Sequence, residues 1–119
     1  MNTNQAVSEY LNVWNETNPE RRRAAIDALY TEDCHYADPL AVVNGRDALD
    51  GLIAGAQKQF PGFTFALAGP IDGHHAQARF TWSAAPKGAA EPVVVGFDVV
   101  ILDGNRIRSV YGFLDKVPG

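Results

Sequence analysis

The segment CHYADPL, residues 34 to 40, places a thiol, a phenol and a carboxylate at alternating positions. Side chains alternate along an extended chain, so Cys34, Tyr36 and Asp38 share one face. A carboxylate in a partly dry pocket has its charged form disfavoured, which raises its pKa and makes it a better general base. Asp38 can therefore handle a proton next to a carbonyl, or it can begin a turn, because Asp-Pro pairs start turns readily.

A second acid, Asp98, lies inside the apolar stretch VVVGFDVVIL. A lone charge there is costly unless it is paired or neutralised. Two solutions are open: Asp98 is protonated and donates to a ligand oxygen, or it forms a structural ion pair with Arg79, Arg106 or Arg108. Alternation puts Gly96 on the same face as Asp98, which predicts room for a ligand beside the carboxyl group.

Other kinds of site are not indicated. The pair His74–His75 follows Asp72 and Gly73 and reads as a hairpin turn, and neighbouring strand residues point to opposite faces. We therefore predict no metal site. Cys34 has no evident basic neighbour and reads as a small hydrophobic residue. The sequence has no phosphate loop and no dinucleotide fingerprint, so we expect no cofactor.

Three helices and a set of strands must position these residues. Apolar residues spaced three and four apart predict helices over about residues 3–16, 19–31 and 47–60. After Gly62 the pattern becomes alternating, and long strands are predicted over about 63–68, 76–83, 92–102 and 106–114. Helices followed by consecutive hairpins indicate an α+β fold.

The strand from Pro92 to Leu102 is apolar on both faces, so both faces should be covered. The three helices can cover one face, and a second copy of the chain is the simplest cover for the other. We therefore predict a homodimer, with the isologous two-fold arrangement as the commonest form.

The composition limits the class of protein. A chain of 119 residues is expected to form one domain spanning 1–119. The N-terminus does not resemble a signal peptide, no apolar run could span a bilayer, and the single cysteine fits a reducing compartment. We expect a cytoplasmic protein without membrane contact. The net charge of −4 argues against nucleic-acid binding.

The layout of elements, together with LYTEDCHYADPL and VVVGFDVVILDGNRIRSVYGFLDK, resembles the nuclear transport factor 2-like superfamily. Within it, the chain is most similar to SnoaL-like proteins and ketosteroid isomerases. The resemblance implies a cone-shaped half-barrel, with three N-terminal helices packed on a strongly curved antiparallel sheet around a deep pocket. Members include isomerases, cyclases, dehydratases, epoxide hydrolases and proteins without catalysis, so the fold alone does not decide the function.

The resemblance also implies roles for three residues. Asp38 occupies the acidic-residue-Pro motif of the general base in ketosteroid isomerases. Tyr10 and Asp98 occupy the positions of the donors that hold the developing enolate oxygen. The residues expected to line the pocket are Trp14, Cys34, Tyr36, Phe65, Trp82, Gly96 and Tyr111, although alternation leaves open which aromatic side chains face it.

Three functional hypotheses follow, one of which is an enzyme that adds or removes water with Asp38 or Asp98 and Arg79. The first is a pocket for a small apolar ligand, with cofactor-free proton transfer next to a carbonyl of the isomerase or cyclase kind. The alternative is a non-catalytic ligand-binding or dimeric scaffold module, in which Asp98 is a paired structural acid. The sequence does not decide whether the protein is an enzyme.

Overall fold

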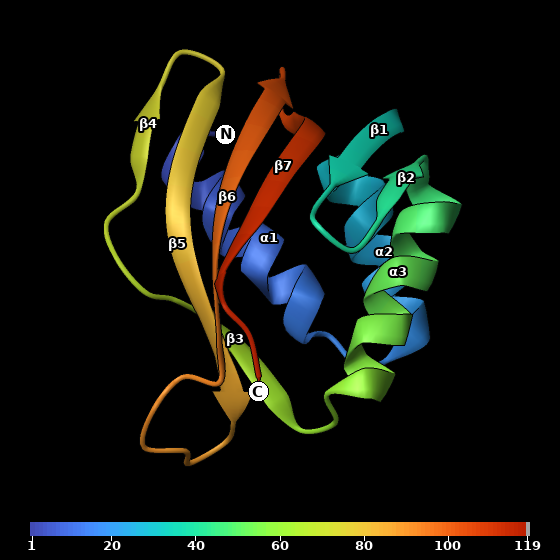
Figure 1. Ribbon diagram of the computed structural model, residues 1–119. Helices are drawn as coiled ribbons and strands as arrows, with labels where there is room; N and C mark the ends of the chain where they lie inside the picture. The colour runs from blue at the N-terminus through green and yellow to red at the C-terminus, as the bar shows by residue number, and fades with distance from the viewer. Residues whose placement is uncertain (119) are drawn as a thin grey trace.

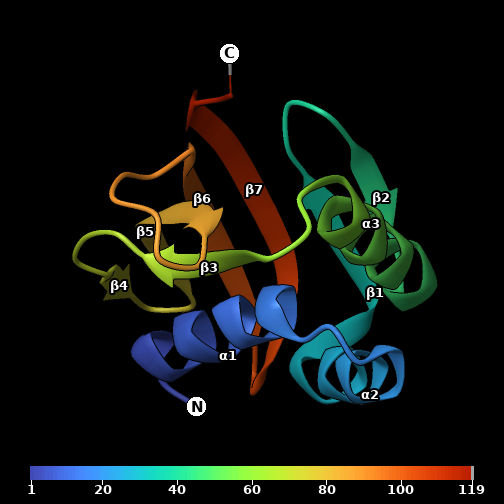
Figure 2. The same ribbon diagram turned by 90° about the horizontal axis from the view of Figure 1, so that it is seen from below.

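The computed structural model describes residues 1–118. Three helices lie together on one side of a curved sheet (Figures 1 and 2). They are α1 (Thr3–Asn15), α2 (Pro19–Leu29) and α3 (Arg46–Gln59). Two of them begin at capping residues, because the side chains of Asn2 and Asn18 accept hydrogen bonds from the backbone N–H groups of Gln5 and Arg21.

Seven strands form one sheet that is not closed into a barrel. The bounds are β1 (Tyr30–Ala37), β2 (Val42–Asn44), β3 (Phe63–Leu67), β4 (Asp72–His74), β5 (Gln77–Pro86), β6 (Val94–Asp103) and β7 (Arg106–Lys116). The strand order is β2-β1-β7-β6-β5-β3, and β4 pairs with β5. All pairs are antiparallel except β1 and β7, which run parallel, so the sheet is mixed.

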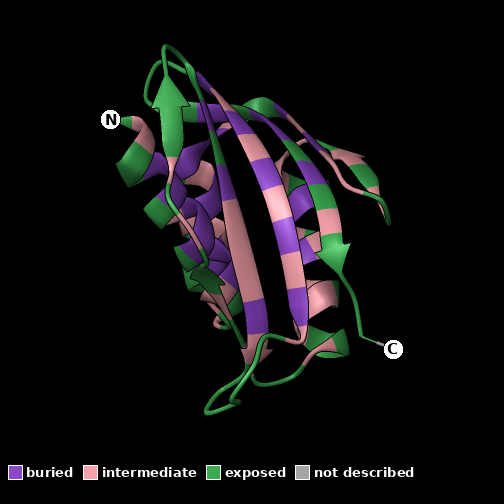
Figure 3. Ribbon diagram, turned by 60° about the vertical axis from the view of Figure 1, so that its left-hand side comes forward, coloured by how far each residue is buried: buried purple, intermediate pink, exposed green. Residues whose placement is uncertain are grey.

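The central strand β6 shows how the sheet separates core from surface. Its residues alternate between buried and half-buried over nearly its whole length (Figure 3). Val94, Gly96, Asp98, Val100 and Leu102 form the buried side, which faces the helices. The pairing with β7 shifts register twice, and such irregularities bend a strand and increase its twist.

The helices are tied to each other and to the edge of the sheet by polar contacts. Arg22 is 5% exposed and donates to Asp50 on α3 at 2.8 Å and to Gln57 Oε1 at 2.9 Å. At the end of α1, the side-chain amide of Asn15 donates from Nδ2 to the carbonyl oxygen of Phe65 at 2.8 Å, and its Oδ1 accepts from the N–H of Phe65 at 2.7 Å. β3 is an edge strand, so Asn15 satisfies backbone groups that have no strand partner there.

The α+β fold with three helices on a curved sheet is confirmed, with one difference in the sheet. β1 follows α2 directly and returns beside β7 in the parallel direction, so the sheet is not purely antiparallel. The pattern of alternation fixes which residues share a face but not the direction of a strand relative to a distant neighbour. Within residues 1–118, no helix has the length and apolar character needed to cross a bilayer.

Candidate functional site

A cavity of about 850 Å³ lies between the helices and the inner face of the sheet. Its wall comes from α1, the C-terminal half of α3, the end of β1, strands β3, β5 and β6, and the segment after β7. Most of the lining side chains are apolar or aromatic. Asp38 and Asp98 both belong to the wall, although 60 positions separate them in the sequence.

Asp98 is held in the cavity by α1 and by its neighbours in the sheet. The side chain is 3% exposed, and its Oδ2 accepts a hydrogen bond from the hydroxyl of Tyr10 at 2.7 Å. Tyr10 lies on the buried face of α1, and Asp98 lies on the buried face of β6, where it pairs with Phe80 and Gly112. The amphipathic helix and the alternating strand thus bring the two side chains together.

This environment perturbs the protonation of both groups. Burial and the nearby charge of Asp38 raise the pKa of Asp98 from 3.8 to about 6. The O–H group of Tyr10 and the N–H group of Trp82 act in the opposite direction and lower this pKa. Trp82 Nε1 is buried and does not reach hydrogen-bond geometry with any described atom. Burial and the charge of Asp98 raise the pKa of Tyr10 well above its usual value, so Tyr10 stays a donor.

Asp38 lies at the start of a tight turn and also faces the cavity. Its Oδ1 accepts hydrogen bonds from the backbone N–H groups of Leu40 at 2.8 Å and Ala41 at 2.9 Å. Its Oδ2 accepts from the hydroxyl of Tyr36 at 2.7 Å. The two hypotheses for Asp38, turn residue and cavity acid, therefore describe the same carboxylate, and three donors already engage it.

Gly112 on β7 allows the two acids to approach one another. A Cβ atom at this position would lie 2.8 Å from Asp98 Oδ1 and 3.4 Å from Asp38 Cβ. Both acids therefore lie against the same side of β7, opposite a residue without a side chain. A larger residue would cover the oxygen of Asp98 that Tyr10 does not bind.

Aromatic rings form one continuous wall of the cavity. The ring centroids of Trp14 and Tyr36 are 5.9 Å apart, those of Trp14 and Phe65 5.4 Å, and those of Phe65 and Trp82 5.5 Å. These four predicted residues line the cavity, as does Tyr10.

The other three residues predicted for the pocket lie elsewhere. Gly96 faces inward, but the indole of Trp82 lies on it, and a Cβ atom there would overlap that ring. The missing side chain therefore makes room for Trp82 and not for a ligand. Tyr111 is 42% exposed on the opposite face of the sheet. Cys34 is buried in the core, and burial raises the pKa of its thiol, which suits a hydrophobic role.

The predicted ion-pair partners of Asp98 are also placed elsewhere. Arg79 is exposed and pairs with Asp72 at 2.9 Å. Arg106 and Arg108 are exposed near the start of β7. Within residues 1–118, Asp98 forms no salt bridge. Of the two solutions left open for Asp98, the structural ion pair is not found among the described residues, because the inward face of β6 meets Tyr10 and no arginine.

One wall of the cavity, formed by α3, was not predicted from the sequence. Gly51, Leu52, Gly55, Ala56 and Gln59 line the cavity from this helix. Glycine weakens a helix interior, so two glycines four positions apart were a usable signal that side chains are unwanted there. A Cβ atom at either glycine would meet nothing within 4 Å. The segment from Leu114 to Pro118 was missed as well, and no pattern in its sequence indicated it.

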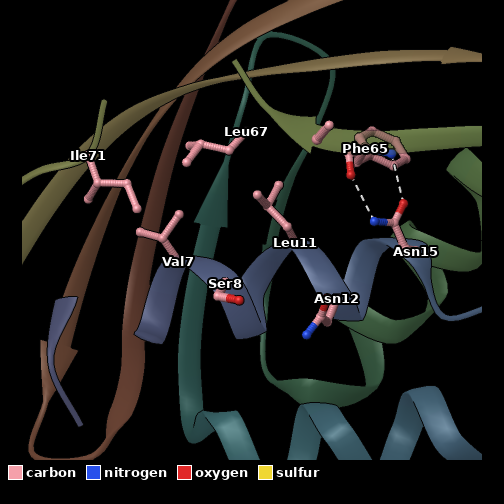
Figure 4. A pocket seen from close by; sticks show the side chains of 9 residues that line it. Val7, Ser8, Leu11, Asn12, Asn15, Phe65, Leu67 and Ile71 are labelled. Atoms are coloured by element: carbon pink, nitrogen blue, oxygen red, sulfur yellow. Dashed lines mark hydrogen bonds between the residues drawn. The ribbon is translucent and has the colours of Figure 1, made fainter. Parts of the chain in front are cut away.

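A second, smaller cavity of about 240 Å³ lies between α1 and β3 (Figure 4). Val7, Leu11, Leu67 and Ile71 give it an apolar lining, and the hydrogen bonds between Asn15 and the backbone of Phe65 close one end. None of its lining residues titrates, so it offers no acid–base chemistry.

Neither cavity contains an evident metal site. In the part of the chain that the structure describes, no three His, Cys, Asp or Glu side chains gather closely enough to hold a metal ion. His74 and His75 lie at the turn between β4 and β5, as expected for a hairpin.

Known proteins with this architecture share the chain's sequence features to different degrees. The family model of the SnoaL-like domain matches residues 7–110. An isomerase candidate of the SnoaL-like family from Agrobacterium tumefaciens is 38% identical, with a TM-score of 0.88 and coverage of 93% of this chain and 95% of that protein. Among curated proteins, none matches the chain significantly.

More distant structures share the fold alone. A ketosteroid isomerase candidate from Kribbella flavida is 16% identical, with a TM-score of 0.71 and coverage of 97% of this chain and 78% of that one. A SnoaL-like polyketide cyclase candidate from Jannaschia is 14% identical, with a TM-score of 0.72 and coverage of 94% and 86%. Since the SnoaL-like domain covers residues 7–110 and a relative is 38% identical over nearly the whole chain, this protein belongs to the SnoaL-like family.

Proposed function

We propose that the cavity binds a small, mostly apolar molecule and that Asp98 transfers a proton on it, in a cofactor-free reaction of the isomerase or cyclase kind. The observation that carries this proposal is the setting of Asp98. Its carboxyl group is buried in the wall of a large cavity, is held by Tyr10, and has a pKa of about 6. A general acid or base works best when its pKa lies near the pH at which it operates.

The hydrogen bonds favour a division of roles that differs from the one implied by family resemblance. Three donors already engage the carboxylate oxygens of Asp38. Asp98 accepts from Tyr10 at Oδ2, and its Oδ1 accepts no hydrogen bond from the described residues. We therefore assign proton abstraction to Asp98, positioning of its carboxylate to Tyr10, and electrostatic support of its raised pKa to Asp38.

The proposed step balances without a further reactant. A proton leaves the carbon next to a carbonyl and binds Asp98 Oδ1, while the electron pair of the broken C–H bond moves into the enolate. An isomerase then returns the proton to a different carbon. A cyclase lets the enolate carbon attack a second carbonyl of the same molecule, and the proton goes to the alkoxide that forms.

The descriptions of two similar proteins agree with this proposal. The Agrobacterium tumefaciens relative is described as an isomerase candidate, and the Jannaschia structure as a polyketide cyclase candidate. Neither names a substrate for this chain.

Exchange of α-protons of model ketones in deuterium oxide tests the proposal without knowledge of the natural substrate. NMR follows the exchange of protons in 2-tetralone, 1-indanone and cyclohex-2-enone with wild-type protein, Asp98→Asn and Asp38→Asn. Circular dichroism checks that each variant is folded. We expect exchange above the buffer rate with wild type, none with Asp98→Asn, and a reduced but measurable rate with Asp38→Asn.

Each other result has a definite meaning. Loss of exchange in Asp38→Asn, with activity kept in Asp98→Asn, contradicts our division of roles and restores Asp38 as the base. Exchange that never exceeds the buffer rate for any ketone contradicts the catalytic proposal and favours the non-catalytic binding module.

A further inference from the structure

We propose that the ligand of the large cavity carries a positive charge, and that the site recognises a small organic cation with an aromatic or apolar body. This inference rests on the proposed function, because it takes the same cavity as the ligand site. It goes further by assigning the charge of the ligand, and it does not depend on which bond reacts.

The charges of the wall all have one sign. Among the described residues that line the cavity, Asp38 and Asp98 alone have charged side chains, and none is Lys, Arg or His. The nearest basic residue in sequence to the α3 wall is Lys58, which is exposed and does not belong to the lining. An anionic ligand would therefore enter a site with two carboxylates and no counter-charge.

The end of α3 adds to the negative potential. Gln59 is the last residue of the helix and Phe60 follows it, and both line the cavity. The C-terminal carbonyl groups of a helix carry a partial negative charge, which attracts cations. No helix N-terminus, where the potential is positive, contributes to the wall.

The aromatic wall completes the complementarity. The rings of Tyr36, Trp14, Phe65 and Trp82 follow one another in this order, and the centroids of neighbouring rings lie 5.4 to 5.9 Å apart. The face of an aromatic ring attracts a cation through its quadrupole, most strongly when water is excluded. A cation bound here would lie beside these rings and balance buried negative charge at the same time.

A neutral carbonyl compound is the alternative ligand. Its affinity should change with pH in the direction opposite to that of a cation. It would accept a hydrogen bond from protonated Asp98, so it binds better in acid, whereas a cation binds better once Asp98 is ionised. The groups that face Asp98 contribute no positive charge; they are Tyr10 from α1, Tyr36 and Asp38 from β1 and its turn, Phe80 and Trp82 from β5, and Gly112 from β7.

Three phenols of nearly equal shape separate these cases. They carry in the meta position a trimethylammonium, a tert-butyl or a sulfonate group, and isothermal titration calorimetry measures their affinity for the wild-type protein between pH 5 and 8. We expect the cation to bind roughly tenfold more tightly than the tert-butyl compound at pH 8, and the sulfonate to bind weakest. The preference for the cation should shrink as pH falls through about 6.

A matched pair of variants at the end of α3 provides a second readout that leaves Asp98 intact. Gln59 lines the cavity and is exposed, so both Gln59→Lys and Gln59→Glu are expected to fold. We expect Gln59→Lys to weaken binding of the cation and Gln59→Glu to strengthen it, and the affinity of the neutral tert-butyl compound to differ less between the two variants.

The outcomes distinguish this inference from the proposed function. If the tert-butyl compound binds as tightly as the cation at pH 8, or if its affinity alone rises in acid, the ligand is not a cation although the cavity remains a ligand site. If none of the three compounds binds at any pH, both the cation inference and the proposed ligand site are contradicted.

Discussion

The substitution Asp98→Asn gives the sharpest expectation for stability. Asparagine keeps the shape of the side chain, and its carbonyl oxygen can still accept the hydrogen bond from Tyr10. The wild-type protein must instead ionise a carboxyl group that is 3% exposed whenever the pH exceeds its pKa. We therefore expect the variant to be the more stable protein at neutral pH.

The magnitude follows from the difference between the two pKa values. The pKa of Asp98 is raised from 3.8, the value of an unperturbed Asp, to about 6 in the folded protein. The folded state thus binds the proton more tightly, so the contribution of Asp98 to stability is complete below about pH 4 and is lost as pH rises through about 6. A shift of about two pKa units corresponds to about 3 kcal/mol. The stability of wild type relative to Asp98→Asn should fall by this amount between pH 4 and 8.

Urea unfolding of both proteins at several pH values measures this difference. Circular dichroism follows the transition, and linear extrapolation gives the free energy of unfolding of each protein at each pH. Taking the difference between the two proteins removes the contribution of the other titrating groups. A difference that does not change with pH, or a wild type that gains stability relative to the variant as pH rises, would contradict a raised pKa of Asp98 in the folded protein.

Three further predictions concern the site and the surface. Tyr10→Phe removes a hydroxyl that lowers the pKa of Asp98, so the NMR titration midpoint of Asp98 should move above the wild-type value; a lower midpoint contradicts the geometry. Gly55→Ala should stabilise α3 by about 1 kcal/mol in urea unfolding, because alanine is the better helix former and the new Cβ meets nothing within 4 Å. Gly55→Ala should also weaken ligand binding, because the alanine side chain narrows the cavity. Reduced stability of this variant would contradict the free space at position 55. Phe113 is 56% exposed on the outer face of the sheet, where the sequence predicts a homodimer, so Phe113→Glu should shift a wild-type dimer to monomer in analytical ultracentrifugation. A monomeric wild type at micromolar concentration contradicts that prediction.

The sequence predicted the elements and the inward faces well because both follow from local periodicity. The spacing of Tyr10 and Trp14 on α1 and the alternation around Asp98 on β6 were sufficient to place these side chains in the interior. Asp38 was ambiguous in the sequence, and the structure shows why, since its carboxylate both caps the turn and lines the cavity.

What the sequence could not give depends on contacts between distant segments. Alternation placed Gly96 inward, but only the position of β5 beside β6 shows that the ring of Trp82 fills the space above it. The parallel pairing of β1 with β7 has no local signature either, yet it brings Asp38 to Gly112 and so to Asp98. These relations arise from the topology of the sheet, which no pattern within a single strand encodes.

The central claim is that Asp98 is a cavity acid whose proton is exchanged near neutral pH. The most direct test is an NMR titration of the protein labelled with ¹³C at the aspartate carboxyl groups, with the Asp98→Asn variant used to assign the signal. We expect a titration midpoint of about 6 for Asp98. A midpoint near 4, the ordinary range of an aspartate, would contradict it.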